Sequence, residues 1–151
     1  MSMIIGNLIA PKLIQCPNGD SFMTSSSKLA NGQTALIEVR DSKLHGLGVF
    51  ACVDLPKGSV IERCFYLVID DDDLQEINRL NDYLFTSPDV KSDYLCVLGC
   101  GMIYNHGAPP NAEWQIADGD NRFIEFTALA DIEAGDEILH DYGGDYWDSR
   151  T

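Results

Sequence analysis

The feature that most constrains the fold of this chain is a series of short apolar runs, rich in β-branched and aromatic residues, that begins at residue 35. The runs cover residues 36–39, 48–53, 60–69, 114–117 and 123–126, and glycine, proline and aspartate separate them. Such runs favour half-buried strands, and the separating residues favour turns. Residues 118–121 (DGDN) join the last two runs, which is typical of a hairpin. The sequence therefore predicts a mainly β fold with one or two short helices.

One helix is predicted after the long third run. Four aspartates at residues 70–73 supply a cap and an acidic first turn, and Ser87-Pro88 ends the segment. Between them, apolar residues recur at helical spacing at Leu74, Ile77, Leu80 and Leu84. We interpret the acidic cluster as the solvated start of this helix rather than as a metal site.

Two segments of the chain resemble each other. Residues 53–61 (VDLPKGSVI) and 130–138 (ADIEAGDEI) each place a glycine turn between apolar ends. This similarity predicts a structural duplication.

Length and charge limit the number of domains and the classes of partner. A chain of 151 residues amounts to one domain, and we expect residues 1–33, which end in polar residues, to form an N-terminal extension to a domain at residues 34–151. Ten Lys and Arg against 24 Asp and Glu give a net charge of −14. This charge disfavours nucleic acid and anionic lipid and favours basic partners.

Localisation follows from the apolar and cysteine content. The apolar stretch at residues 3–10 is too short to span a bilayer. The five cysteines are scattered, which suits buried thiols in a reducing compartment better than a disulfide framework or a zinc site. We therefore expect a cytoplasmic or nuclear protein that is not secreted and holds no metal.

Residues 45–51 (HGLGVFA) contain the string G-x-G-x-x-A. A dinucleotide site would need a helix to start at these glycines, whereas residues 49–53 have the pattern of a strand. The glycines are consistent with close approach of the backbone to a ligand, and equally with a simple tight turn.

Two further segments carry candidate functional residues. Residues 99–112 place Asn105 and His106 in a loop rich in glycine and proline, where they offer hydrogen-bond donors and acceptors. A single histidine in such a place is more often structural than catalytic. Residues 135–147 place aromatic side chains beside glycines, and by default such aromatics belong to a core or an interface.

In this order, three segments resemble the motifs of the SET family of protein lysine methyltransferases. HGLGVFA is similar to the family's first cofactor motif, YNHGAPPNA (104–112) to its N-H-S-x-x-P-N motif, and GDEILHDYG (135–143) to its G-E-E-L-x-x-D-Y motif. The resemblance extends from residue 35 to residue 148. Residues 82–85 (DYLF) and 142–147 (YGGDYW) make it closest to the compact SET proteins of algal viruses, which are small and dimeric and methylate histone tails.

The resemblance implies a β-clip fold with a C-terminal pseudoknot and S-adenosylmethionine as cofactor. By motif, the residues that would bind the cofactor are Gly46, Leu47, Gly48, Asn105 and His106. Tyr142 would be the catalytic residue together with Tyr83, and the channel for the substrate lysine would be lined by Tyr83, His140, Tyr142, Tyr146 and Trp147. The implied substrate is a lysine ε-amino group in a basic protein such as a histone tail, and the implied assembly is a homodimer, located in the host nucleus if the protein is viral.

These residue types suit methyl transfer. The amine must be neutral and aimed at the methyl group, and a channel of aromatic rings excludes water and disfavours the ammonium form. No strong base is needed once the proton leaves to solvent, so His106 is not expected to be one. The acidic surface would attract a basic substrate.

The chain departs from the family in three places. His140 stands where many relatives have Phe or Tyr and leaves the number of methyl groups added open, and Gly107 stands in place of the usual Ser. No cysteine cluster follows Trp147, so Tyr146, Trp147 or a second subunit would close the channel.

Two alternatives remain. One is a SET fold that binds a peptide or partner without transferring a methyl group, which failure to bind S-adenosylmethionine would favour. The other is an unrelated β protein in which these strings are turns and core.

Overall fold

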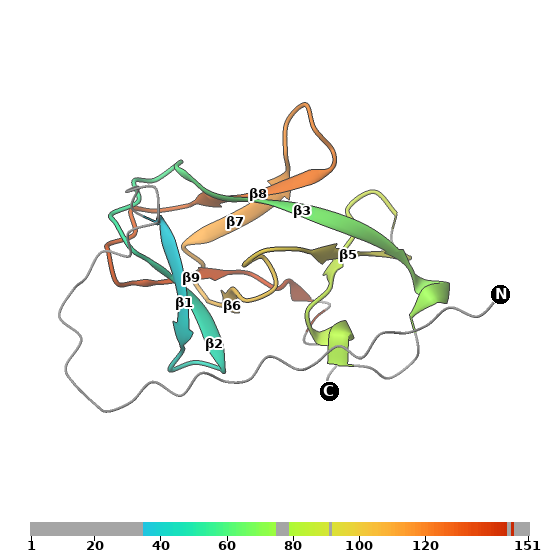
Figure 1. Cartoon of the computed structure of the whole chain (residues 1–151), viewed down its shortest axis with the longest axis horizontal. Helices are drawn as coiled ribbons and strands as arrows, with labels where there is room; N and C mark the ends of the chain where they lie inside the picture. Colours follow the sequence, from blue (N-terminus) through green and yellow to red (C-terminus); the bar gives the residue numbers. More distant parts are fainter. Residues whose placement is uncertain (1–34, 75–78, 91, 145, 147–151) are drawn as a thin grey trace, which may run out of the picture.

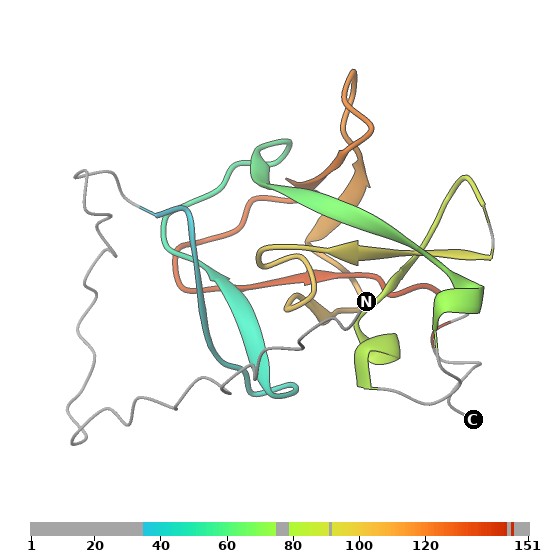
Figure 2. The same cartoon turned by 45° about the vertical axis from the view of Figure 1, so that its right-hand side comes forward.

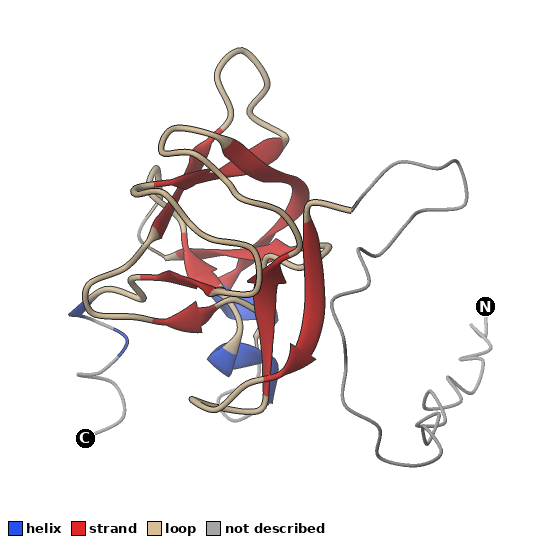
Figure 3. Ribbon diagram, turned by 90° about the vertical axis from the view of Figure 1, so that its left-hand side faces the viewer, coloured by secondary structure: helices blue, strands red, loops and turns tan. Residues whose placement is uncertain are grey.

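The computed structural model describes residues 35–74, 79–90, 92–144 and 146, and this part of the chain is built mainly of strands (Figure 1). The strands are β1 Ile37–Asp41, β2 Leu47–Ala51, β3 Val60–Asp70, β4 Phe85–Thr86, β5 Asp93–Val97, β6 Asn105–His106, β7 Ala112–Ile116, β8 Phe123–Ala128 and β9 Glu137–His140. Two short 3-10 helices, η1 Asp71–Asp73 and η2 Arg79–Asp82, lie together at one end of the strands (Figure 3). The predicted extension at residues 1–33 lies outside the described residues.

The strands form two sheets. One has the order β1-β2-β9-β6 and the other the order β4-β5-β3-β8-β7. The long strand β3 crosses the molecule and pairs with β8 along its first half and with β5 along its second half (Figure 2). Alternation of buried and half-buried residues along β8 turns one of its faces into the core, where Ile124 and Phe126 have no exposed surface.

The C-terminal strand β9 lies inside the first sheet rather than at its edge. It pairs antiparallel with β2 and parallel with β6, which come from much earlier parts of the chain. The loop after β6 is tied to it, because Gly107 N donates to His140 O at 3.1 Å and Asn111 N donates to Leu139 O at 3.0 Å. The Asn111 side chain adds a hydrogen bond from Leu139 N at 2.7 Å. This enclosure of β9 agrees with the predicted β-clip fold and its pseudoknot.

The two similar sequence segments occupy equivalent positions beside each other. Leu55 and Ile132 exchange both backbone hydrogen bonds, at 2.8 and 2.9 Å. Asp131 Oδ1 accepts from the backbone N–H of residue 57 at 2.8 Å, and Asp54 Oδ1 accepts from that of residue 134 at 2.9 Å. Each aspartate therefore caps the glycine turn of the other segment, and the predicted duplication is confirmed.

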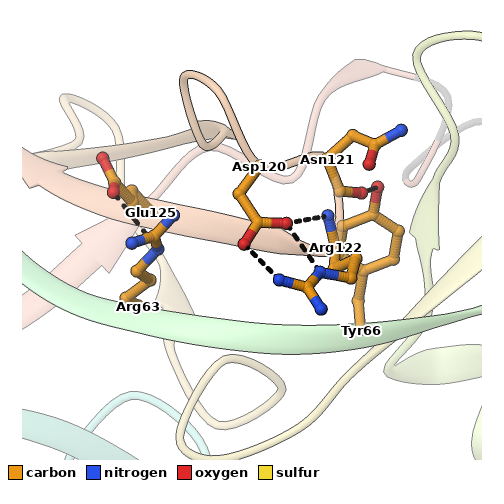
Figure 4. A network of polar contacts seen from close by, with 6 residues as sticks. All are labelled: Arg63, Tyr66, Asp120, Asn121, Arg122 and Glu125. Carbon is orange, nitrogen blue, oxygen red and sulfur yellow. Dashed lines mark hydrogen bonds and ion pairs between the residues drawn. The ribbon is translucent and has the colours of Figure 1, made fainter.

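The predicted hairpin at residues 118–121 is also confirmed, because β7 and β8 pair antiparallel on either side of it. Figure 4 shows its polar contacts: Arg122 donates twice to the Asp120 carboxylate, each time at 2.8 Å, and the Tyr66 hydroxyl donates to Asn121 O. Arg63 on β3 lies 3.5 Å from the Glu125 carboxylate on β8. These contacts tie the hairpin to β3.

The predicted helix is wrong in extent. The Asp70 side chain accepts from Asp72 N at 3.0 Å and caps η1, but the chain leaves the helical conformation at Leu74, with φ −89° and ψ 127°. Ile77 lies outside the described residues. Leu80 keeps 38% of its surface exposed, so this position of the predicted apolar stripe is not buried in the core, and packing is what stabilises most helices. The segment then continues into β4, which pairs with β5.

No helix in the described part of the chain combines the length and the apolarity needed to cross a membrane.

Candidate active site

The segment with the predicted cofactor residues is the turn between β1 and β2. Ser42 N donates to Gly46 O at 2.8 Å and closes the turn. No atom lies within 4 Å of the place that a Cβ would take at Gly46, so a ligand can approach the backbone there. Leu47 is half exposed beside it. At Gly48 a Cβ would lie 2.1 Å from Glu137 Oε1, so any other residue would displace this carboxylate.

The Asn105 side chain binds the carbonyl groups of this turn. Its side chain is 7% exposed, and Nδ2 lies 3.1 Å from His45 O, 3.0 Å from Leu47 O and 2.8 Å from Glu137 Oε1. Glu137 also accepts a hydrogen bond from the Ser42 hydroxyl at 2.9 Å. Asn105 therefore holds the turn through two of its carbonyl groups, and Glu137 holds it through the Ser42 hydroxyl. Sequence reasoning missed Glu137, although it lies within the third motif.

His106 connects this turn with the aromatic residues. Its Nδ1 accepts a hydrogen bond from Tyr142 N at 3.3 Å and lies 3.6 Å from Asp141 Oδ1. The parallel pairing of β6 with β9 places His106 directly beside His140. Because Nδ1 already holds the backbone of Tyr142, the geometry gives His106 an orienting part.

Tyr142 is the centre of the aromatic cluster. Its hydroxyl donates to Tyr104 O at 2.8 Å. Burial, and then the neighbouring Tyr146 and Tyr83 hydroxyls, raise the pKa of Tyr142 to about 12. The Tyr146 ring meets the Tyr142 ring edge-on at 4.6 Å. Tyr142 therefore keeps its proton at neutral pH and directs it to the Tyr104 carbonyl.

His140 is a buried neutral member of the same cluster. It is 3% exposed, stacks on Phe85 with ring centroids 5.4 Å apart, and lies 4.9 Å from the Tyr142 ring. Burial lowers the pKa of His140 to about 4. Nδ1 lies 3.1 Å from Asp141 O, an acceptor, so the Nδ1–H tautomer fits this neutral ring. Phe85, which sequence reasoning did not single out, comes from the same DYLF string as Tyr83.

Tyr83 follows η2, where its N–H donates to Leu80 O at 2.9 Å, and it is 51% exposed. The structure thus brings together His140, Tyr142 and Tyr146, and Tyr83 is close enough to contribute to the raised pKa of Tyr142. Trp147, the fifth predicted channel residue, lies outside the described residues. Across the described ranges, no group of three or more His, Cys, Asp or Glu side chains is arranged to hold a metal ion.

The model of the SET domain matches residues 46–143, which is most of the part described. The chain belongs to the SET-domain family. Its match with the "Histone-lysine N-methyltransferase, H3 lysine-37 specific" of Schizosaccharomyces pombe has 29% identity over 114 residues, 74% of this chain and 76% of that protein. Its match with human histone-lysine N-methyltransferase EHMT1 has 27% identity and covers 95% of this chain but 12% of that protein.

Solved structures agree with this SET assignment. A Plasmodium falciparum structure described as a histone methyltransferase has a TM-score of 0.60 and 34% identity, over 76% of this chain and 99% of that one. The Polycomb Repressive Complex 2 of Chaetomium thermophilum, bound to S-adenosylmethionine, has a TM-score of 0.61 and 24% identity over 75% of this chain and 16% of that one, a likeness of fold. The predicted fold and enzyme class, a SET-type protein-lysine methyltransferase, are confirmed.

S-adenosylmethionine is the cofactor of this class, and the site fits it. The turn at residues 42–48 leaves the backbone at Gly46 open to a ligand, and its carbonyls are held in place by Asn105. The fit therefore rests on the shape of the backbone rather than on a charged side chain.

Proposed function

We propose that this SET-domain protein transfers a methyl group from S-adenosylmethionine to the ε-amino group of a lysine in a basic protein, with a histone tail as the first candidate. The observation that carries the proposal is the hydrogen bond from the Tyr142 hydroxyl to Tyr104 O inside an aromatic cluster that adjoins the glycine turn. Gly46, Leu47 and Gly48 would hold the cofactor through their backbone, with Asn105 and His106 supporting them.

The aromatic side chains would prepare the lysine. When bound, S-adenosylmethionine supplies an electrophilic methyl group. Tyr83, His140, Tyr142 and Tyr146 would surround the lysine stem, exclude water and favour the neutral amine. The Tyr142 hydroxyl, whose proton points to Tyr104 O, would align the methyl group through a weak C–H hydrogen bond.

No protein base is assigned to the amine. His106 Nδ1 is engaged by Tyr142 N, and neutral His140 is buried against Phe85. Loss of the ammonium proton to solvent before transfer would suffice.

The charge of the chain and the names of its relatives support a basic protein substrate. At a net charge of −14 the chain attracts Lys-rich segments and repels nucleic acid, so we propose no direct contact with DNA or RNA. The S. pombe and human relatives are both named as histone-lysine methyltransferases. A site of action in the nucleus or the cytoplasm is consistent with such a substrate.

We also propose that the chain forms a homodimer, as expected for a compact SET protein of the algal-virus type with residues 1–33 as an extension. Apolar side chains on one face of the five-stranded sheet support this, because Phe65, Leu67 and Leu98 are 40, 49 and 42% exposed. Light scattering after gel filtration tests the mass, and a monomer at micromolar concentration would contradict the proposal.

The methyltransferase proposal is tested with radiolabelled S-adenosylmethionine and a panel of histones and basic ribosomal proteins. Tyr142→Phe is expected to lose label by about a hundredfold, because it removes the hydroxyl that orders the site. Tyr66→Phe is the matched control, since it removes a tyrosine hydroxyl of β3 that contacts the hairpin at Asn121 rather than the aromatic cluster. Cofactor binding without label on any protein would exclude the tested substrates, and absence of cofactor binding would contradict the proposal.

A further inference from the structure

The Glu62 side chain, on β3, binds both ends of residues 100–104, the segment that precedes Asn105. One carboxylate oxygen, Oε1, accepts a hydrogen bond from Cys100 N at 3.0 Å. The other, Oε2, accepts from the Tyr104 hydroxyl at 3.1 Å. Between these points the chain turns, with Ile103 N donating to Cys100 O at 2.8 Å. A single side chain from another strand therefore closes this turn.

The surroundings keep the donors to Glu62 protonated. Burial, and next the Glu62 charge, raise the pKa of Tyr104 far above its ordinary value. Burial likewise raises the pKa of Cys64 to about 12 and raises that of Cys100, with the Glu62 charge and hydrogen bonds to Glu62 adding to both. The carboxylate thus accepts from a phenol and a backbone N–H, and hydrogen bonds to a carboxylate are stronger than those between neutral groups.

The Tyr104 side chain transmits this restraint to its own backbone. It is 1% exposed and stacks on Phe126 with ring centroids 4.3 Å apart, so the packed core restrains the ring. The Tyr104 carbonyl is the acceptor of the Tyr142 hydroxyl, at 2.8 Å. Glu62, Tyr104 and Tyr142 therefore form one continuous chain of contacts from β3 to the centre of the site.

We propose that Glu62 is a positioning residue for Tyr142. By holding the Tyr104 phenol and the start of the turn, it fixes the Tyr104 carbonyl and with it the direction of the Tyr142 hydroxyl. This inference rests on the proposed function, in which that hydroxyl orders the reacting groups. Glu62 itself does not touch substrate or cofactor.

The variants separate positioning from simple loss of stability. Glu62→Ala removes both restraints. Glu62→Gln keeps the length, accepts from Cys100 N with its amide oxygen and can donate to the Tyr104 oxygen. Tyr104→Phe removes the phenol contact and keeps the ring. Glu125→Ala is the matched control, because it removes a glutamate of β8 that pairs with Arg63 outside the core.

The first measurement determines kcat and KM separately, for S-adenosylmethionine and for a peptide or protein that the wild-type enzyme methylates. Circular dichroism monitors folding of each variant. Glu62→Ala is expected to lower kcat by about tenfold or more with KM nearly unchanged, because misplacement of a catalytic group acts on the transition state. Tyr104→Phe should show the same pattern, and Glu62→Gln should restore most of kcat. Folded Glu62→Ala protein with wild-type kcat would overturn the inference.

The second measurement needs no activity. Tyrosine labelled with carbon-13 at Cζ reports the hydroxyl environment by NMR, and Tyr142→Phe assigns the Tyr142 signal. Glu62→Ala and Tyr104→Phe should shift this signal, whereas Glu125→Ala should not. If the wild-type protein transfers no methyl group, the proposed function fails while this experiment still decides whether Glu62 orders Tyr142. An unshifted signal in both folded variants overturns the inference.

Discussion

Acidification should lower the free energy of unfolding of this protein through protonation of His140 in the unfolded chain. The substitution His140→Phe should abolish this contribution. Burial lowers the pKa of His140 from 6.5 to about 4. Between these two values the unfolded chain binds a proton that the native chain excludes, so the free energy of unfolding falls as the pH falls from 6.5 to 4. At about 1.4 kcal/mol per pKa unit, the loss reaches about 2 kcal/mol at pH 5 and about 3 kcal/mol below pH 4.

His140→Phe keeps a ring that can stack on Phe85 and removes the titration. Urea unfolding of both proteins at several pH values between 7 and 4 gives the difference in the free energy of unfolding. The titration of carboxylates is common to both and cancels. His45→Gln is the control, since it removes an exposed imidazole and leaves His140 in place. As the pH falls, the free energy of unfolding of His140→Phe should rise relative to that of the wild type by the amounts above. Parallel pH profiles for the wild type and His140→Phe would refute the reasoning.

Three further substitutions test other parts of the structure. Gly107→Ala should cost about 1–3 kcal/mol in urea unfolding, because its Cβ would lie 2.6 Å from Leu139 Cβ, and a coupled Leu139→Gly, which removes that Cβ, should give a combined loss smaller than the sum of the two single losses; additive losses would contradict the clash. Gly48→Ala should weaken cofactor binding in calorimetry by about tenfold or more, since the new methyl overlaps the carboxylate beneath the turn, and unchanged affinity would exclude that turn as the cofactor site. Asp54→Ala and Asp131→Ala should each lower stability by about 1 kcal/mol and by similar amounts, because the two caps are equivalent, and strongly unequal melting temperatures would argue against that equivalence.

Features encoded locally could be predicted from the sequence. The runs that became β3 and β8 carry strand-forming residues along their whole length, and the turn at 118–121 has the residues that a hairpin needs. The equivalence of the two glycine turns was visible because each segment repeats the same order of aspartate, apolar residue and glycine.

The predicted helix failed because its periodicity was not matched by burial. Leu74, Ile77, Leu80 and Leu84 recur at helical spacing, yet Leu80 is substantially exposed, and β4 takes the end of the segment into a sheet. The spacing of apolar residues shows that a helix could form, whereas packing of its apolar face against the rest of the protein decides whether it is stable.

The partners of the site residues could not be predicted, because they come from distant strands. The motif placed Asn105 at the cofactor site, but only the fold shows that its amide is spent on the His45 and Leu47 carbonyls. Glu62 likewise has no local signal, since its contacts are made 38 and 42 residues further along the chain. The unusual glycine at position 107 is explained by Leu139, which occupies the space that a side chain would need.

The position of β9 between β2 and β6 in the four-stranded sheet determines at which point of synthesis the active site can assemble. β2 and β6 are synthesised before residues 137–140, and until β9 is made the strand edges that it will cover have no partner from it. Pairings between such distant segments form slowly and expose apolar edges to aggregation. The Asn105 and Tyr142 regions are joined through the pairing of β6 with β9, so a chain that ends before β9 has no assembled active site, and catalysis requires β9 to have entered the sheet.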